Sequence, residues 1–373
     1  MTKKKEAENM KSSETKRVLV AGASGGVGQF ICREVVRLFS PHSLVVADYK
    51  IERGRKFAKS LGEAVNTRYV DVNNRESLNE ALDGIDAVIV ATQPKAPHIQ
   101  SVCVAHRIPC LDITVQPEFI AQVKELESRA VSQETVLIIM AGLFPGLSGI
   151  MAKHAVETMQ HVSSIDVGLL QNTQATTGTM GIADMLGLFA QPVLFKKEGK
   201  HQSMPGFTVT RTMVYPEPFG QKIQRLVNFV EAAVISETCN VCDVNYWTSF
   251  DKAYFNGFLV LLKKIGFLKL FNRSKTRVKL ARVINLSKKG SRSQPETTSV
   301  IVEVSGHKQD KPCTTLLSLI APSDYGTTAM SVVAMTKLIL SQQVSARGVR
   351  YPLEVFPLDL LMDTINCDQL KIH

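Results

Sequence analysis

The sequence predicts an α/β protein in which a Rossmann-type doubly wound parallel sheet carries an inserted mixed α/β substrate domain. Up to about residue 150, short apolar runs alternate with segments of helical length. After about residue 160 this alternation gives way to a mixed pattern that is typical of more exposed sheet. The chain has 373 residues, of which 45% are hydrophobic, so it is long enough to build two cores.

The apolar runs of the first part are the expected strands of the parallel sheet. Buried parallel strands must be joined by crossover helices, and right-handed crossovers build a Rossmann-type domain. The first run is followed by a helical pattern through Phe39 and the second by a helix over 51–61. The six expected strands are 17–22, 43–48, 66–70, 86–91, 109–113 and 135–140.

The second part predicts helices over 180–189 and 219–233 and a last helix over 327–342 that packs back on the first domain. The expected strands are 164–170, 193–196, 207–210, 241–249, 275–285, 299–304 and 314–320. The resulting division is a flexible tail (1–15), a dinucleotide-binding domain (16–150), a substrate and dimerisation domain (151–326) and a C-terminal helix and tail (327–373).

A glycine-rich turn joins the first strand to the first helix. A diphosphate must come close enough to a helix N-terminus for backbone N–H groups and the helix dipole to bind it, and a Cβ would block that approach. The residues of this turn that we expect to contact a dinucleotide are Gly22, Ser24, Gly25, Gly26, Val27 and Gly28. Asp48 closes the second strand 20 residues later, where a carboxylate accepts hydrogen bonds from the adenosine ribose.

The residues around Asp48 leave the choice between NAD and NADP open. The Asp48 carboxylate repels a 2′-phosphate, whereas Lys50 and Arg53 neutralise one, and the balance slightly favours NAD. After the third strand, Asp71 and Val72 are placed to meet the adenine, although Asp71 fits a helix N-cap equally well. The residues expected beside the nicotinamide, at the end of the fourth strand, are Ala91, Thr92, Gln93 and Pro94.

Three residues at strand ends are the candidate catalytic groups. Asp112 ends the fifth strand, and it is either a proton-transfer group or a structural hydrogen-bonding residue. His98 either transfers a proton or lies on a helix face, and Lys95 either holds a substrate carboxylate or is a solvated loop residue. His154 and the loop 176–179 are weaker candidates, and the Tyr-x-x-x-Lys pair of short-chain dehydrogenases is absent from the sequence.

The chain resembles the saccharopine dehydrogenase-like oxidoreductases. The resemblance lies in VLVAGASGGVG, LVVADYKIERGRKFA, VIVATQP, LDITVQPEF, AGLFPGLSGIMA and GVRYPLEVF, and it is most secure over 16–160. It implies hydride transfer with NAD(P) at a C–N (imine/amine) or carbonyl centre of an amino-acid-like substrate, and a homodimer.

Two positions depart from the family pattern. Thr114 stands where saccharopine reductases have a Tyr, and Phe144 stands where they have an acid/base Asp. Because Phe cannot transfer a proton, these departures argue against saccharopine itself as the substrate. They also keep open an alternative, a dinucleotide-binding protein without turnover that associates with a membrane or a protein partner through a basic amphipathic segment.

That basic segment carries more positive charge than the net charge of the whole chain. Residues 252–295 contain twelve Lys and Arg and neither Asp nor Glu, against a net charge of +10 for the whole chain. Residues 254–292 combine apolar and basic side chains, which fits either contact with an anionic membrane surface or a core or dimer-interface helix. Nucleic-acid binding is not expected, because the aromatic residues are not interleaved with the cations.

The cysteines and the N-terminus indicate a reducing compartment. The seven cysteines form no disulfide framework, and the N-terminus has no apolar core of a secretory signal, so we expect a cytoplasmic protein. Cys239 and Cys242 form a CxxC without a second pair at zinc-ribbon spacing, so we expect two strand residues and no metal site.

Overall fold

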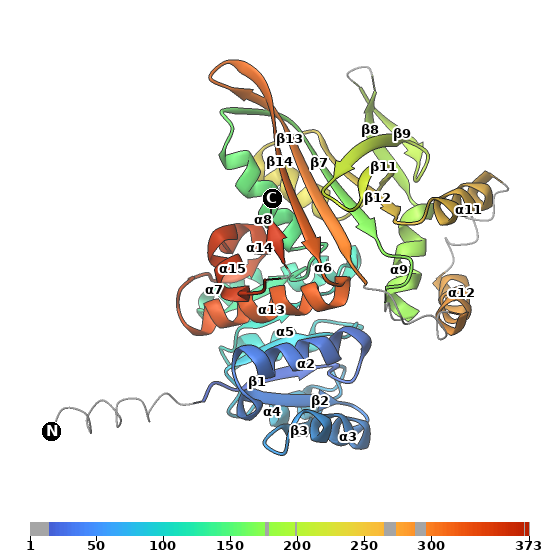
Figure 1. The fold of residues 1–373 in the computed structure, drawn as a ribbon. Helices are drawn as coiled ribbons and strands as arrows, with labels where there is room; N and C mark the ends of the chain where they lie inside the picture. Colours follow the sequence, from blue (N-terminus) through green and yellow to red (C-terminus); the bar gives the residue numbers. More distant parts are fainter. Residues whose placement is uncertain are drawn as a thin grey trace.

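The computed structural model describes residues 15–175, 179–197, 200–264, 274–287, 296–368 and 370–372. These residues form two seven-stranded sheets and a two-stranded hairpin (Figure 1). The expected α/β class is therefore confirmed, with a parallel sheet and a second, mixed sheet.

The first sheet is parallel throughout and has the order β15-β6-β5-β4-β1-β2-β3. Its strands are β1 (Val18–Ala21), β2 (Leu44–Asp48), β3 (Asn66–Tyr69), β4 (Ala87–Val90), β5 (Cys110–Asp112), β6 (Val136–Ile139) and β15 (Gly348–Arg350). Every residue of β1, β2, β4 and β6 is buried, because helices cover both faces of the sheet. All six predicted strands are present, and β15 adds a seventh. From β1 the chain first adds β2 and β3 on one side of the sheet and then returns to add β4, β5 and β6 on the other side. The switch point therefore lies between β1 and β4, and open α/β sheets bind their ligands at such a point.

The helices of this domain connect consecutive strands. They are α2 (Gly26–Leu38), the 3-10 turn η1 (Pro41–Ser43), α3 (Ile51–Leu61), α4 (Arg75–Ala81), α5 (His98–Ala105), α6 (Pro117–Lys124) and α7 (Glu127–Ser132). The helix predicted over 51–61 agrees with α3 at both ends.

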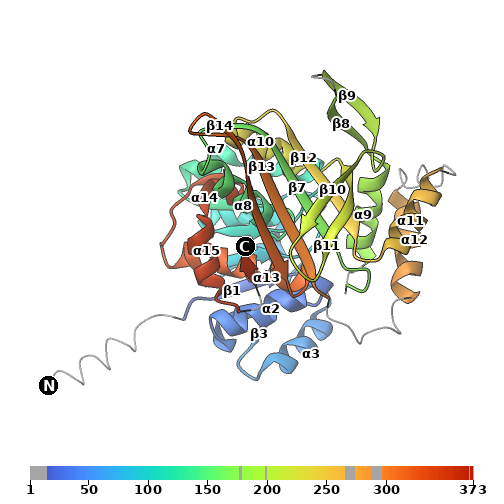
Figure 2. The same cartoon turned by 45° about the horizontal axis from the view of Figure 1, so that its top comes forward.

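The helix α13 (Asp324–Leu340) lies between the two sheets. It packs against α2 and α15 (Leu358–Ile365), and Figures 1 and 2 place it between α2 and the second sheet. Its sequence explains this position, since Asp324 and Lys337 are its two charged residues and its apolar side chains lie on all faces.

The second sheet is mixed, in the order β10-β11-β12-β7-β13-β14-β16. Its strands are β7 (His161–Gln171), β10 (Thr210–Tyr215), β11 (Gly220–Val227), β12 (Val244–Phe250), β13 (Thr298–Lys308), β14 (Lys311–Ala321) and β16 (Lys371–Ile372). The hairpin consists of β8 (Pro192–Lys197) and β9 (Lys200–Pro205). The associated helices are α8 (Leu147–Glu157), α9 (Thr179–Ala190), α10 (Glu231–Cys239), α11 (Ala253–Lys264), α12 (Ser274–Ser287) and α14 (Pro352–Val355). None of the helices in the described ranges combines the length and the apolar composition needed to cross a bilayer.

Two predicted elements of the second domain are of the wrong type. The helix predicted over 219–233 is instead the strand β11 followed by α10, because Gly220, with φ +61°, closes a hairpin that pairs β11 with β10. The strand predicted over 275–285 is the helix α12, whose buried Ala281 and partly buried Val278 lie one turn apart, and α12 packs on α9.

Smaller errors fall at turns, and some of the predicted segments lie outside the described residues and are not tested. The strand predicted over 207–210 is β10, which begins only at Thr210, three residues later than predicted. The buried Phe207 has a left-handed φ of +66° and so cannot be part of the strand. Cys239 ends α10 and Cys242 lies in the following loop, so neither is the strand residue that was predicted. Residues 1–14 of the expected tail, 176–178 of the candidate loop, and 265–273 and 288–295 of the basic segment lie outside the described residues.

A buried carboxylate ties the start of α8 to the second domain. Glu231 is fully buried, and its Oε1 accepts a hydrogen bond from the Gly146 amide at 2.7 Å. Its Oε2 accepts hydrogen bonds from the hydroxyls of Ser148 and Tyr246, both at 2.5 Å. Burial raises the pKa of Glu231 above its ordinary value even though these hydrogen bonds oppose the rise. Glu231 therefore caps α8, the helix that links the first sheet to β7, from outside that helix.

Replacing Glu231 should destabilise the protein strongly. In Glu231→Ala the three donors lose their acceptor, and we expect the free energy of unfolding to fall by about 3–5 kcal/mol in urea titrations. Glu237→Ala, which changes an exposed acid of the same helix, is the control and should shift it by less than about 0.5 kcal/mol. Equal effects of the two substitutions would contradict this role of Glu231.

Candidate functional site

The turn between β1 and α2 is built almost entirely from backbone. Gly22 has φ +81°, and a Cβ there would lie 2.8 Å from the Ala91 carbonyl oxygen. A Cβ on Gly28 would lie 2.2 Å from the Gly22 oxygen, so only glycine lets α2 approach β1 this closely. Gly25 is the N-cap of α2 and provides no side-chain cap, and Gly26 is exposed. The first amides of α2 are therefore open to an anion, which fits the diphosphate of a dinucleotide.

At the end of β2, the Asp48 carboxylate is already paired. Arg53 donates two hydrogen bonds to it, at 2.7 and 2.9 Å, and the Lys50 amide donates a third at 2.8 Å. Burial would raise the pKa of Asp48, but the hydrogen bonds from Arg53, Lys50 and Ser24 outweigh it and hold the pKa below its ordinary value. The Asp48 side chain is 0% exposed, whereas that of Arg53 is 47% exposed. The face that this strand end offers to a ligand is therefore cationic.

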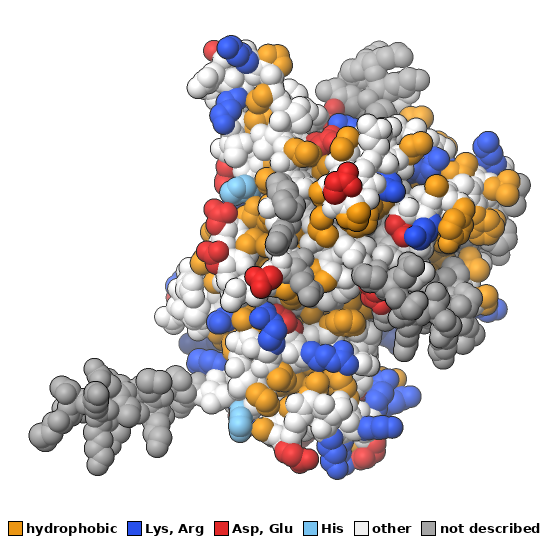
Figure 3. All heavy atoms as spheres, viewed as in Figure 1, with side chains coloured by type: hydrophobic (Ala, Val, Ile, Leu, Met, Phe, Trp, Pro, Cys, Tyr) orange, Lys and Arg blue, Asp and Glu red, His pale blue; other side chains and the backbone are white. Residues whose placement is uncertain are grey.

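An exposed aromatic ring lies between the two cations. The ring of Tyr49 is within 5.6 Å of the Lys50 ammonium and 5.3 Å of the Arg53 guanidinium. Figure 3 shows Lys and Arg side chains gathered over the neighbouring helix α3.

The other expected cofactor residues lie at the ends of β3 and β4. Asp71 accepts a hydrogen bond from the Asn73 amide, while the N-cap of α4 is Asn74, so the predicted alternative of an N-cap at Asp71 is wrong. Asn73 in turn accepts the Lys95 amide at 3.3 Å, which joins the two loops. Next to the glycine turn, the Ala91 amide donates to the Ala21 carbonyl at 2.8 Å. Of the remaining expected residues, Val72, Thr92 and Val27 are partly buried, Gln93 is exposed and Pro94 is buried.

The three catalytic candidates do not come together. Asp112 is 1% exposed, and its carboxylate accepts the Thr114 amide at 2.7 Å and the Gln100 side-chain amide at 2.6 Å. Burial raises its pKa to about 6, against the opposing effect of these hydrogen bonds. His98 begins α5 and is half-buried, and Lys95 is exposed. This geometry gives Asp112 two structural partners that hold the loop after β5.

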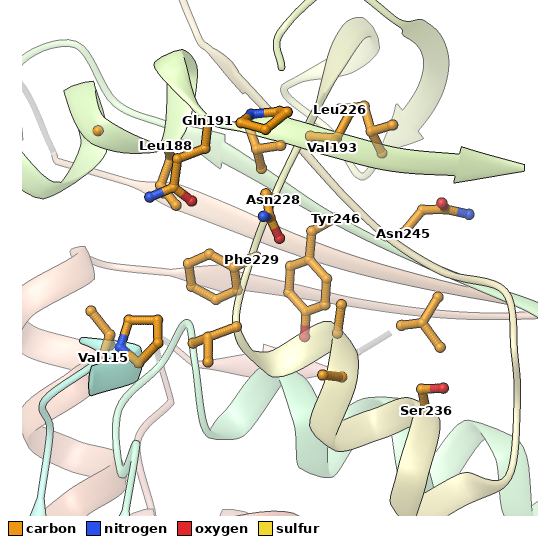
Figure 4. Close-up of a pocket in the computed structure, with 18 of the residues that line it drawn as sticks. Val115, Leu188, Gln191, Val193, Leu226, Asn228, Phe229, Ser236, Asn245 and Tyr246 are labelled. Carbon is orange, nitrogen blue, oxygen red and sulfur yellow. The ribbon is translucent and has the colours of Figure 1, made fainter. Parts of the chain in front are cut away.

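A cavity of about 830 Å³ opens beside the carboxyl ends of β4 and β5. It is lined by residues of α9, β8, β11, α10, β12 and α12 and by residues 115–118 after β5, and none of the three catalytic candidates lines it. Figure 4 shows the rings of Phe229 and Tyr246 side by side, with the Asn228 amide nearby and Leu188 and Val193 across the cavity. The walls thus combine apolar side chains with polar ones, among them Gln116, Asn228 and Asn245, as in many small-molecule sites.

Asp184 is a titratable group of this cavity that the sequence analysis missed. The Gln93 side-chain amide, at the end of β4, donates to its Oδ2 at 3.1 Å. Burial raises the pKa of Asp184, while hydrogen bonds from Gln93 and Gln116 and the charge of Arg277 lower it, and the net shift is upward. The available signal was in α9 itself, where Asp184 is the one charged residue of an apolar helix.

Phe144, which replaces the family's acid, belongs to an aromatic cluster behind the cavity wall. Its ring lies 4.7 Å from that of Phe229 and 5.1 Å from that of Tyr246. These contacts give the position a packing role and place no proton donor there. In the described residues, no group of three or more His, Cys, Asp or Glu is arranged to hold a metal ion.

Comparison with known proteins identifies the first domain. Residues 18–138 match the family model described as the saccharopine dehydrogenase NADP binding domain, in agreement with the resemblance found in the sequence and with an NAD(P)-binding domain. The apo saccharopine dehydrogenase (L-Glu forming) from Saccharomyces cerevisiae matches with a TM-score of 0.69 and 14% identity, over 96% of this chain and 99% of that chain. This likeness shows that the two chains share a fold. DAP dehydrogenase of C. glutamicum in complex with DAP matches with a TM-score of 0.46 and 13% identity, over 93% and 95%. No protein in a search of curated sequences matches significantly.

Replacing Asp112 should change how stability depends on pH. The folded protein keeps a proton on Asp112 up to about pH 6, whereas the unfolded chain loses it near pH 3.8. The contribution of Asp112 to stability therefore falls as pH rises from about 4 to 6, by on the order of 2–3 kcal/mol. In Asp112→Asn this fall disappears, since the Gln100 amide can rotate and accept the new N–H through its unpartnered Oε1.

The measurement is the free energy of unfolding in urea between pH 4 and pH 7. We expect the free energy of unfolding of the variant to rise relative to that of the wild type as the pH rises from about 4 to 6. Above about pH 6 the difference between the two should stay constant. The exposed Asp83→Asn is the control. A difference that is the same at every pH would show that the pKa of Asp112 is not raised in the folded protein.

Proposed function

We propose that this protein is an NADP(H)-dependent oxidoreductase acting on an amino-acid-like substrate, because residues 18–138 match the saccharopine dehydrogenase NADP binding domain. The observation that carries the proposal is the turn formed by Gly22, Gly25 and Gly28 at the uncapped start of α2. Ala91 contacts this turn, and Gln93, two residues further on, donates a hydrogen bond to Asp184 of the cavity. When bound, the cofactor exchanges a hydride with the substrate. The chain's own residues hold the two ligands, exclude water and move the accompanying proton.

The preference for NADP(H) rests on the state of Asp48. To accept ribose hydroxyls, its carboxylate would have to give up Arg53, which neutralises and covers it. The half-exposed Arg53 and the exposed Lys50 instead suit a 2′-phosphate, because both are cations on the ligand side of Asp48. The slight lean to NAD that the sequence suggested finds no support, and NADP(H) is our proposal.

We assign proton transfer to Asp184 in place of the three candidates named from the sequence. Its carboxyl lines the cavity, while Asp112 is closed off by its own partners and Lys95 and His98 lie outside the lining. Burial raises the pKa of Asp184 above its ordinary value, and this direction makes its carboxylate a stronger base for taking up the proton. At a C–N centre, Asp184 Oδ would accept one proton from the substrate ammonium and return it on reversal.

A second function, association with a membrane or with another copy of the chain, is supported by α11. Tyr254, Phe258 and Leu261 are 75%, 53% and 56% exposed and lie on one face of this helix at positions i, i+4 and i+7. Figure 3 shows hydrophobic side chains gathered over α11. With Lys263 and Lys264 at its end, the helix suits the surface of an anionic bilayer. The family resemblance also favours a homodimer, for which the same face is available.

The cofactor proposal predicts a selective loss of NADPH affinity. We expect Lys50→Gln to weaken NADPH binding about tenfold and Arg53→Gln about ten- to hundredfold, because each loses a charge-assisted phosphate contact, with little change for NADH. The measurement is the nicotinamide fluorescence on titration of each cofactor. Lys59→Gln, on the exposed side of α3, is the matched control.

A further variant separates recognition of the 2′-phosphate from binding of the diphosphate. Gly25→Val places a side chain 3.1 Å or less from the Gly22 oxygen and should weaken NADPH and NADH alike. Equal loss of both cofactors in Lys50→Gln would contradict the assignment of NADP(H). Undiminished binding in Gly25→Val would contradict the dinucleotide site itself.

The membrane proposal predicts binding that depends on both charge and apolar surface. The wild type should float with liposomes containing anionic lipid, and Phe258→Ser with Leu261→Ser should abolish flotation. Lys263→Glu with Lys264→Glu should reduce it at least severalfold. Flotation that is unchanged in both double variants would refute the proposal. Loss of a dimer in light scattering of the Ser variant, without any flotation of the wild type, would assign this face to self-association.

A further inference from the structure

We propose that the cavity binds an α-amino acid with one carboxylate and a bulky apolar side chain, whose ammonium is received by Asp184 and whose carboxylate is received by Arg277. This inference rests on the proposed function, because it places the substrate beside the loops that would face the cofactor. It goes further by naming the class of substrate and the two residues that recognise it.

The Asp184 carboxylate is fixed at the junction of the two domains. The side-chain amides of Gln93 and Gln116 reach it from the ends of β4 and β5. Both are donors, so they orient the carboxylate as an acceptor without neutralising it. A carboxylate has about four lone-pair sites, and these two amides leave room for an ammonium group. An amine held here lies at the carboxyl ends of the parallel strands, which is where open α/β sheets bind their ligands.

Arg277 supplies the opposite charge from a different element. It projects from α12, and its guanidinium carbon lies 3.3 Å from the position that a Cβ on Gly187 of α9 would occupy. Glycine at 187 therefore lets the guanidinium lie against α9, one turn from Asp184. Arg277 also lines the cavity, and its charge acts on Asp184. A planar guanidinium binds a carboxylate through two parallel hydrogen bonds, so the pair matches the two charges of an amino acid.

The acids of the cavity disfavour a second carboxylate on the substrate. Among the lining residues that the structure describes, Glu118 and Asp243 are acids besides Asp184, and Arg277 is a cation. A ligand with two or three carboxylates, such as glutamate or saccharopine, would bring further negative charge toward these acids. An amino acid with an uncharged side chain brings one charge for each of the two partners.

The size and walls of the cavity select the side chain. The volume of about 830 Å³ is large for a single small amino acid. Its lining includes the apolar side chains of Leu188, Val193, Leu226 and Phe229 and the ring of Tyr246, together with polar side chains such as Gln191 and Asn228. Burying an apolar side chain against these residues contributes roughly 25 cal/mol per Å² of apolar area removed from water. A large apolar group is therefore bound more tightly than a small or polar one.

The test is calorimetric titration of the full-length protein with L-phenylalanine, carried out with and without saturating NADPH. Two analogues isolate the two contacts, since 3-phenylpropanoate lacks the ammonium and 2-phenylethylamine lacks the carboxylate. Asp184→Asn should weaken binding of L-phenylalanine and 2-phenylethylamine by about tenfold or more but should not weaken binding of 3-phenylpropanoate. Arg277→Gln should weaken binding of L-phenylalanine and 3-phenylpropanoate but should not weaken binding of 2-phenylethylamine. Lys279→Gln, an exposed cation of the same helix, is the control and should alter none of them.

Several outcomes would overturn the inference. It fails if L-glutamate or saccharopine binds more tightly than L-phenylalanine, or if both cavity variants bind L-phenylalanine as the wild type does. It also fails if the protein binds NADPH but none of the amino acids. If the wild-type protein does not bind NADPH, the proposed function is refuted instead. The titrations without cofactor would then still show whether the cavity binds an amino acid.

Discussion

The contact of backbone with backbone at the β1–α2 turn is the constraint on which the rest of the site depends. Because a Cβ on Gly28 would lie 2.2 Å from the Gly22 oxygen, α2 can sit at its observed distance from β1 only with glycine at both positions. The same closeness brings Ala91, at the end of β4, against the turn. The start of α2 and the ends of β1 and β4 thus converge at one point of the sheet. Ligand-binding groups on the loops after β4 and β5 then need only short side chains to reach the same region.

The buried carboxylates of the protein divide into those that serve the fold and one that faces the cavity. Asp112 and Glu231 have their oxygens engaged by neighbouring amides and hydroxyls, so their charges hold the loop after β5 and the start of α8. Asp48 is neutralised by Arg53. Asp184 differs, because its hydrogen-bond donors come from two loops of the other domain and its carboxyl lines open space. Burial alone does not identify a reactive acid, and what surrounds its free lone pairs is more informative.

The sequence predicted the first domain well because each local signal there agrees with the global fold. The strands of the parallel sheet are continuous apolar runs, and the glycine turn and Asp48 occupy fixed places relative to them. The second domain was less predictable. The segment of β11 has apolar residues at spacings that suit a helix, and the hairpin with β10 decides between the two. The strand predicted at α12 was wrong for a similar reason, since packing against α9 determines its type.

The catalytic candidates were less predictable than the fold because proximity to the cavity depends on the second domain. Reasoning from strand ends pointed to Asp112, but it could not show that Gln100 and Thr114 occupy its oxygens. Asp184 lies on the helix α9 of the second domain, 91 residues after Gln93 in the sequence, and only the folded chain brings the two side chains together. The sequence shows that Asp184 is the one charged residue of the apolar helix α9. It does not show that Gln93 donates a hydrogen bond to this carboxylate.

The replacement of the family's acid by Phe144 is consistent with this arrangement. An aspartate at 144 would lie among the rings of Phe229 and Tyr246, close to the already buried Glu231 that Tyr246 contacts, and two carboxylates there would repel each other. Phenylalanine removes that conflict and extends the apolar wall behind the cavity. Position 144 therefore holds a packing residue behind the cavity wall. Asp184, in contrast, lines the cavity and is fixed there by the Gln93 side chain of the first domain.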